Sequence, residues 1–351
     1  MSYPSKFLLF SDPHLGKNLS ANTTAGSRES LKLNLFWAAS RAIQMAQLLP
    51  VCLGDLFDSF SNSEKIILQG ASIAADCYIV LAGNHDTSNN KEAVSSLDIV
   101  DSLAPGSVLS HKYGNTGVLI KGPFAAIPHV ATTALFEAAL DAAEALKEKP
   151  PYLLLHCNYD SGFAEADISL NLTQSRAKQL IESGYKRIFI GHEHSYAEHM
   201  GGKVIVLGNT YPTGFSDISD KWAVVLDVEA DTIERNLLWS KEKGYIEITV
   251  PLAEGYDYAA PIEQEFIRVS GKVEPGELGQ YAAWVRKVWK TNPYLIALKS
   301  DVTVTQSKGQ TINQTAEYRT VTEQITAELE HSPELLAVWK EVAPSHSVGV
   351  E

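Results

Sequence analysis

The feature that most constrains this chain is a series of five short polar segments, each of which follows an apolar run of three or four residues. Each segment carries aspartate, asparagine or histidine side chains. The segments are residues 11–14, 54–58, 83–86, 155–156 and 191–194, and the runs are 7–10, 51–53, 78–81, 152–154 and 188–190. Strands of a parallel sheet end at a common edge, where ligand sites form. The pattern therefore predicts one site at one edge of a sheet.

The regions between the runs predict an α/β fold. Leu31, Leu35, Ala38 and Ala42 recur at helical spacing between the first two runs, and similar patterns flank the third run. This alternation indicates a largely parallel sheet with helices packed on it. Between residues 204 and 250, four strand-like runs predict an antiparallel second sheet. We therefore expect residues 1–255 to form a two-sheet β-sandwich flanked by helices.

Two further regions follow a linker at residues 251–261, which contains proline and glycine. Residues 262–312 combine strand-like runs with one helical stripe, which predicts a small α+β domain. Residues 313–351 carry two helical patterns, the second of which opens with Ser332 and Pro333. We expect this last region to be a helical tail.

The residue types in the polar segments favour a metal centre. Aspartate, asparagine and histidine without a thiolate suit Mn²⁺, Fe²⁺ or Zn²⁺ better than a closed, sulfur-rich zinc site. The candidate ligands are too many for one tetrahedral ion and suit two ions that share a carboxylate. One assignment gives Asp12, His14 and His194 to the first ion and Asn84, His156 and His192 to the second, with Asp55 bridging both.

Such a centre predicts hydrolysis of a phosphoester. Two ions lower the pKa of a water molecule between them, so that it attacks phosphorus as hydroxide near neutral pH. The leaving oxygen needs a proton, and His85 is the expected donor because it adjoins a predicted ligand without being needed as one. Asp58 is expected to hydrogen-bond His85 and keep it protonated. Asp86 is instead a candidate for bonding the backbone of its turn.

Each segment has a simpler explanation when it is taken alone. Asp-x-His and Gly-Asp-x-x-Asp are most often surface turns, and one histidine after an apolar run is most often a buried core residue. The occurrence of all five segments in this order, each after an apolar run, favours the metal centre over these explanations.

The whole set resembles the motifs of the calcineurin-like metallophosphoesterases. Their ligands correspond to the seven residues named above, and their catalytic histidine corresponds to His85. The resemblance covers residues 6 to about 250. Within that superfamily, residues 11–17, 54–58 and 191–194 are similar to motifs of the SbcD/Mre-type DNA repair nucleases, phage members included.

This resemblance implies an exonuclease and endonuclease that uses two divalent ions, with Mn²⁺ expected and Mg²⁺, Fe²⁺ or Zn²⁺ as alternatives. It implies that residues 262–312 form a capping domain and that the C-terminal helices bind the coiled-coil base of an SMC-like ATPase of the SbcC/Rad type. It also implies a homodimer, formed through helices near residues 62–75 and 90–103. The implied role is that of the nuclease subunit in a complex for DNA end processing, repair or recombination.

The net charge of the chain limits how it could bind DNA. The formal net charge of −13 argues against a protein whose whole surface attracts nucleic acid. It does not exclude DNA as substrate, because bound cations supply local positive charge. Lys17 and Arg28, with Lys32 and Lys91, are the candidates for phosphate contacts. We expect a cytoplasmic protein without a membrane span, because the first apolar run is short and the cysteines are widely spaced.

Two other functions stay open. A nucleotide or cyclic-nucleotide phosphodiesterase or phosphatase of the same fold would use the same two ions for the same chemistry. A Ser/Thr protein phosphatase is disfavoured, because Ser59, Phe60 and Asp86 stand where that family has Arg-Gly and Glu. A catalytically weak scaffold for an ATPase or DNA complex is opposed by the complete ligand set.

Overall fold

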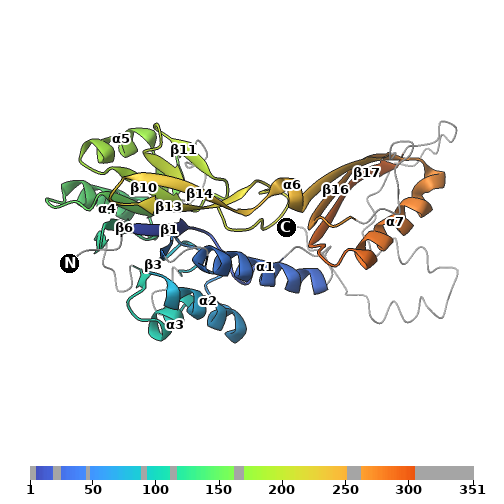
Figure 1. Cartoon of the computed structure of the whole chain (residues 1–351), viewed down its shortest axis with the longest axis horizontal. Helices are drawn as coiled ribbons and strands as arrows, with labels where there is room; N and C mark the ends of the chain where they lie inside the picture. Colours follow the sequence, from blue (N-terminus) through green and yellow to red (C-terminus); the bar gives the residue numbers. More distant parts are fainter. Residues whose placement is uncertain are drawn as a thin grey trace, which may run out of the picture. The chain divides into compact units, whose positions relative to one another are not determined.

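The computed structural model describes residues 5–18, 25–44, 48–87, 93–110, 117–161, 170–250 and 262–304. Its centre is a pair of six-stranded sheets (Figure 1). The first sheet has the order β14 (Thr232–Trp239), β13 (Lys221–Asp227), β1 (Lys6–Phe10), β2 (Leu49–Cys52), β3 (Ile79–Leu81), β4 (Val108–Leu109). The second has the order β11 (Ala197–His199), β12 (Val204–Val206), β10 (Arg187–Gly191), β7 (Tyr152–His156), β6 (Phe124–Ile127), β5 (Leu119–Lys121).

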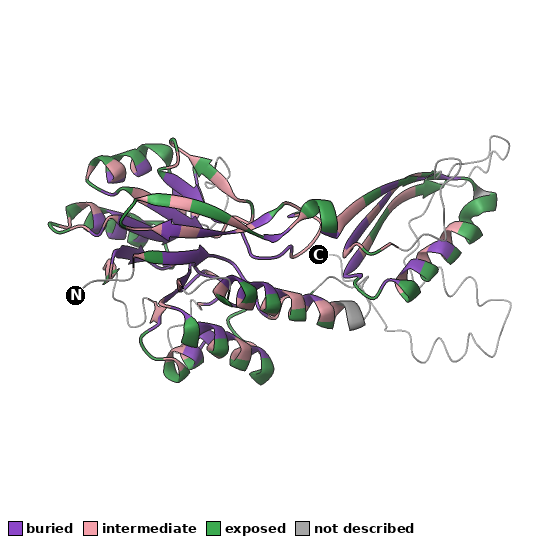
Figure 2. Cartoon of the chain, in the orientation of Figure 1, coloured by how far each residue is buried: buried purple, intermediate pink, exposed green. Residues whose placement is uncertain are grey.

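The inner faces of the two sheets share one hydrophobic core. Phe7 and Leu9 of β1 pack there with Phe124 of β6 and Leu154 of β7. The alternate residues Leu8 and Phe10 point to the other face of the first sheet and are equally buried. Figure 2 shows the central strands buried over most of their length. Strands buried on both faces need continuous apolar runs, which is why these segments stand out in the sequence.

Helices cover the outer face of each sheet. The first sheet packs against α1 (Ala25–Gln44), α2 (Glu64–Asp76) and α3 (Ser96–Leu103). The second packs against α4 (Thr133–Ala145) and α5 (Gln174–Glu182). Thr132, Thr173 and Ser95 begin α4, α5 and α3 by accepting a backbone N–H bond at the helix start. The result is the predicted α/β class, a two-sheet β-sandwich flanked by helices.

Smaller elements complete the described chain. A two-stranded sheet joins β8 (Asn158–Tyr159) to β9 (Asn171–Leu172). A three-stranded parallel sheet has the order β15 (Tyr245–Val250), β16 (Phe266–Val273), β17 (Ala297–Val304). The remaining helices are α6 (Lys241–Gly244), α7 (Leu278–Thr291) and a 3₁₀ turn at Pro275–Glu277. Trp284 and Val288 of α7 pack on the three-stranded sheet.

The prediction that residues 204–250 form an antiparallel second sheet is wrong. β12 runs parallel to β10 in the second sheet. β13 and β14 are antiparallel, but they extend the first sheet beside β1. β15 pairs with β16 in the small sheet. An alternation of apolar and polar residues indicates that one face of a strand is buried, but it does not indicate which strand lies beside it.

The domain boundaries at residues 255 and 262 stay a prediction. The linker at 251–261, the end of the small domain at 305–312 and the tail at 313–351 lie outside the described residues. Within the described residues, no helix has the length and apolar character needed to cross a membrane.

Candidate metal centre

The five polar segments come from two sheets rather than one. β1, β2 and β3 belong to the first sheet and β7 and β10 to the second, which corrects the expectation of a single sheet edge. Backbone bonds tie the segments together: Asp12 N donates to Gly54 O at 3.1 Å, and Cys157 N donates to Gly191 O at 3.3 Å. Across the two sheets, His192 N donates to Asp12 Oδ2 at 3.0 Å. The site therefore lies at one end of the sandwich.

Four of the predicted ligands have a left-handed backbone. The φ angles are 52° at Asp12, 47° at His14, 47° at Asp55 and 97° at His192. Residues other than glycine rarely adopt this conformation, and it persists where the surroundings determine it strongly. Asp12, Asp55 and His192 lie within three residues of the ends of β1, β2 and β10, respectively. The left-handed turn therefore ends each strand at the site.

Glycines beside the ligands leave room for their side chains. A Cβ at Gly54 would collide with the His156 ring, and one at Gly83 would collide with the Asp55 carboxylate. A Cβ at Gly191 would collide with Ser11 Oγ. The ligands can approach one another only because these positions carry no side chain.

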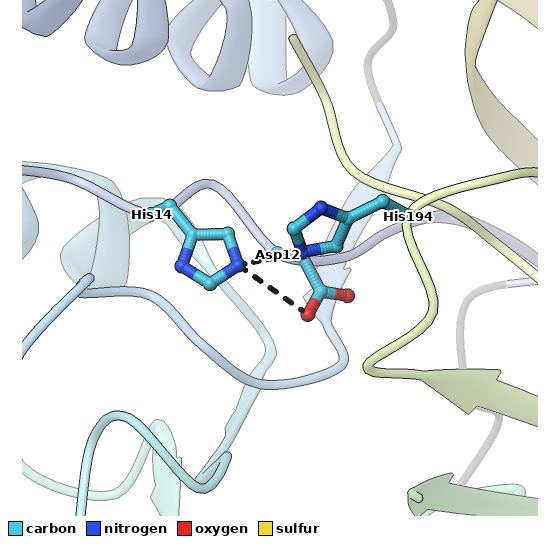
Figure 3. A group of neighbouring side chains, drawn as sticks. All are labelled: Asp12, His14 and His194. Atoms are coloured by element: carbon cyan, nitrogen blue, oxygen red, sulfur yellow. Dashed lines mark hydrogen bonds and ion pairs between the residues drawn. The ribbon is translucent and has the colours of Figure 1, made fainter. Parts of the chain in front are cut away.

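The first group comprises Asp12, His14 and His194 (Figure 3). His14 Nε2 lies 3.0 Å from His194 Nε2 and 3.9 Å from Asp12 Oδ1. Two nitrogens that are about 2.1 Å from one ion and at right angles would be about 3.0 Å apart. The separation of the two nitrogens is compatible with ligands to one ion.

The second group comprises Asn84, His156 and His192. Asn84 Oδ1 lies 3.0 Å from His156 Nε2 and 2.9 Å from His192 Nδ1. His156 Nδ1 donates to Leu53 O at 2.7 Å, which fixes the tautomer and leaves Nε2 facing the site. Nitrogen and amide oxygen donors of this kind suit a divalent transition-metal ion.

Asp55 lies between the two groups. Its Oδ2 is 3.9 Å from His14 Nε2 and its Oδ1 is 3.4 Å from His156 Nε2. Burial alone would raise the pKa of Asp55, but the neighbouring His156 and His14 hold it well below its usual range. An ionised carboxylate with one oxygen toward each group suits the predicted bridging role. The assignment of the seven residues as ligands stays a prediction.

The predicted hydrogen bond between Asp58 and His85 is present, but it uses the main-chain oxygen of Asp58 and not its carboxylate. His85 Nδ1 lies 2.8 Å from the main-chain oxygen of Asp58 and donates to it. The Asp58 carboxylate instead lies 3.3 Å from His14 Nδ1 and 2.9 Å from Lys17 Nζ. His85 remains half-exposed at the site, with Nε2 4.0 Å from Asp55 Oδ2. Asp58 therefore acts on a predicted metal ligand and, through its backbone, fixes the orientation of His85.

The other predicted residues have mixed surroundings. The Asp86 carboxylate accepts bonds from the backbone N–H groups of Leu56, Phe57 and Gly83, as its structural role predicts. Lys17 reaches the edge of the site, but its charge faces Asp58. Arg28 lies half-buried on α1. The roles of Lys17, Arg28 and Lys32 in substrate binding stay predictions, and Lys91 lies outside the described residues.

Three residues near the site escaped the sequence analysis. The Asp217 carboxylate lies 3.3 Å from His194 Nδ1, and the buried Lys221 donates to the main-chain oxygen of His194 at 3.0 Å. Burial lowers the pKa of Lys221 to about 8, although Asp217 opposes the shift. The rings of His129 and His156 lie nearly perpendicular to each other, with centroids 6.5 Å apart. His129 follows the apolar β6, so the same strand-end signal was present for it.

Comparison with known proteins identifies the family of this chain. No curated protein matches the chain with significance. A solved structure described as a novel archaeal phosphodiesterase is similar, with 13% identity and a TM-score of 0.30 over 66% of this chain and 99% of the other. Residues 5–196, more than half of the chain, match the calcineurin-like phosphoesterase family. The chain therefore belongs to the calcineurin-like phosphoesterases, a family of metal-dependent hydrolases that act on phosphoesters.

Proposed function

We propose that this chain is a two-metal DNA nuclease, the nuclease subunit of an SbcC–SbcD-type complex that processes DNA ends. The observation that carries the proposal is the pairing of the two segments that resemble those nucleases. Leu15 N donates to Leu56 O at 2.9 Å, and Asp58 N donates to Leu15 O at 3.0 Å. This pairing builds one wall of the site, on which His14, Asp58 and His85 converge.

The residues of this wall suit cleavage of a phosphodiester. Two bound divalent ions would supply an activated water molecule and positive charge for the phosphoryl oxygens. His85 directs Nδ1–H to the Asp58 carbonyl, so the imidazolium form presents its second proton, on Nε2, to the leaving oxygen and becomes neutral when it gives that proton up. The alkoxide released from DNA is a poor leaving group, so proton donation should accelerate cleavage of DNA more than cleavage of an activated ester.

One observation favours a second candidate, a nucleotide or cyclic-nucleotide phosphodiesterase. Lys17 was a predicted phosphate contact, but its Nζ lies 2.9 Å from Asp58. A paired lysine offers less charge to a long polyanion, whereas a small diester needs only the ions and His85.

The deciding experiment compares end-labelled linear duplex DNA with bis-p-nitrophenyl phosphate and a cyclic nucleotide. The chain is tested with Mn²⁺, with Mg²⁺ and with EDTA, each with and without an SMC-like ATPase partner. The proposal expects DNA cleavage that requires a divalent ion and is fastest with Mn²⁺. Hydrolysis of the small esters with no cleavage of any DNA would establish the second candidate instead.

The proposed homodimer has a suitable surface. Large apolar side chains are exposed on or beside α2 and α3, namely Phe60, Leu68, Val94, Ile99 and Leu103. Exposed apolar side chains on two helices that contact each other suit a self-complementary interface. Sedimentation should show a dimer that Leu68→Asp with Leu103→Asp converts to a monomer. Leu135→Asp on α4, which is also exposed, should leave the dimer intact. A monomeric wild-type chain at micromolar concentration would contradict the proposal.

The ATPase partner is proposed on the resemblance alone, because residues 313–351 lie outside the described part of the chain. Its binding is tested by co-purification with full-length chain and with a chain that ends at residue 312. Retention of the ATPase by the shortened chain would move the binding segment elsewhere.

A further inference from the structure

The two groups of predicted ligands differ in what lies behind their histidines. In the first group, His14 Nδ1 faces the Asp58 carboxylate and His194 Nδ1 faces the Asp217 carboxylate, each at 3.3 Å. In the second group, His156 Nδ1 donates to a neutral carbonyl, Leu53 O. Among the described residues, no carboxylate lies within ion-pair distance of a ring nitrogen of His192.

A carboxylate behind a metal-binding histidine changes the strength of that ligand. It fixes the tautomer and the ring orientation, and it makes the nitrogen that faces the ion more basic. Loss of such a partner weakens metal binding by about 10- to 100-fold. The first group has two histidines of this kind together with the charged Asp12. The second group has the neutral Asn84 in the corresponding place.

Asp217 is held rigidly for this task. Its carboxylate accepts bonds from Asn209 Nδ2 at 2.7 Å, Thr213 Oγ1 at 3.0 Å and Gly214 N at 3.2 Å. Lys221, which is 1% exposed, donates to the main-chain oxygens of Asp217 at 2.7 Å and His194 at 3.0 Å. Lys221 therefore holds the backbone of the predicted ligand His194 close to the backbone of Asp217.

From this difference we infer that Asp217 is a positioning residue for His194 and that the Asp12–His14–His194 group binds its ion more tightly than the Asn84–His156–His192 group. The two ions therefore enter in a fixed order. The first group fills at low metal concentration, and the second fills only at higher concentration. The inference rests on the metal centre and not on the identity of the substrate.

The test is a titration of the chelator-stripped full chain with Mn²⁺ alone, followed by the electron paramagnetic resonance signal of the free ion. The wild-type chain should bind one ion tightly and a second at least about 10-fold more weakly. Asp217→Asn should weaken the first ion by about 10- to 100-fold and leave the second within about threefold. The control is Asp231→Asn, since Asp231 pairs with Tyr152 and Arg187, away from the ligands. It should leave both affinities unchanged.

A second variant identifies the sites and holds even where Asp217→Asn does not fold. His156→Ala removes a ligand of the second group, so one ion should remain and should bind with the tight affinity of the wild type. Two equal affinities in the wild-type chain would overturn the inference. So would a weak remaining ion in His156→Ala, or an Asp217→Asn variant that weakens only the second ion. DNA cleavage plays no part in these readouts, so failure of the proposed substrate leaves them valid.

Discussion

Gly54 gives the sharpest test of how the centre is built. Its φ angle is 103°, and a Cβ there would lie well inside van der Waals contact with Nδ1 of the His156 ring. Gly54→Ala therefore forces the ring to move away from the strand end. The movement breaks the 2.7 Å bond from His156 Nδ1 to Leu53 O and draws Nε2 away from Asn84 and Asp55.

Two terms set the size of the effect on stability. A left-handed backbone costs an alanine about 1–2 kcal/mol relative to glycine. Loss of the buried bond from His156 adds about 0.5–1.5 kcal/mol, and more where a partner stays unsatisfied. Together they lower the free energy of unfolding by about 1.5–3.5 kcal/mol. The displaced nitrogen should also abolish metal binding at the second group.

Urea unfolding in EDTA and Mn²⁺ titration measure the two effects separately. Gly106→Ala is the matched control, because its φ angle is 88° and no atom of the described residues lies within 4 Å of the added carbon. It carries the backbone strain without the collision, so it should cost only about 1–2 kcal/mol and leave metal binding intact. A Gly54→Ala chain as stable as Gly106→Ala, with both ions still bound, would refute the reasoning.

Three further outcomes follow from the site. His85→Ala should keep both ions but slow DNA cleavage by about 10²- to 10⁴-fold, with a smaller loss on bis-p-nitrophenyl phosphate, whose leaving group needs no proton; undiminished cleavage would exclude His85 as the donor. Asp58→Asn should weaken metal binding by about 10-fold or more, because the Asp58 carboxylate faces His14. A variant that binds metal normally and only cleaves more slowly would show that Asp58 acts on His85 instead. Burial lowers the pKa of His156, but Asp55 and Asp12 more than offset this and raise it to about 9, so the metal-free chain holds a proton there at pH 7.5. Metal binding should release this proton at pH 7.5 and no longer release it well above pH 9, as calorimetry in buffers of different ionisation enthalpy would show; heats that do not depend on the buffer would contradict it.

The positions of the strands that carry the site could be predicted from the sequence. Their runs are apolar at every position because both faces are buried, as Phe7 and Leu8 on opposite faces of β1 show. The apolar pattern did not predict which strands pair with β12, β13 and β15. Pairing depends on which strand ends meet in space, and alternation within one strand carries no record of it.

The candidate site shows the same division. The residues whose spacing matches a motif were found, and the structure brings all seven predicted ligands together. The atom that Asp58 offers to His85 was not predictable, because one turn of backbone decides whether a carboxylate or a carbonyl faces the ring. Asp217 and Lys221 were missed because they follow no apolar run at a motif spacing and reach His194 only through space.

The strained backbone of the ligands bears on how the centre responds to metal. Left-handed conformations at Asp12, His14, Asp55 and His192 cost on the order of 1 kcal/mol each, or about 4 kcal/mol together. Such conformations survive without an ion only where neighbouring strands impose them, and β1, β2 and β10 are each paired on both sides. The ligands are therefore positioned by the sandwich and not by the ions, unlike those of small zinc domains that unfold without metal. EDTA should abolish hydrolysis and lower the unfolding midpoint while the chain still unfolds cooperatively in urea. Loss of cooperative unfolding in EDTA would show that the ions, and not the two sheets, hold these turns.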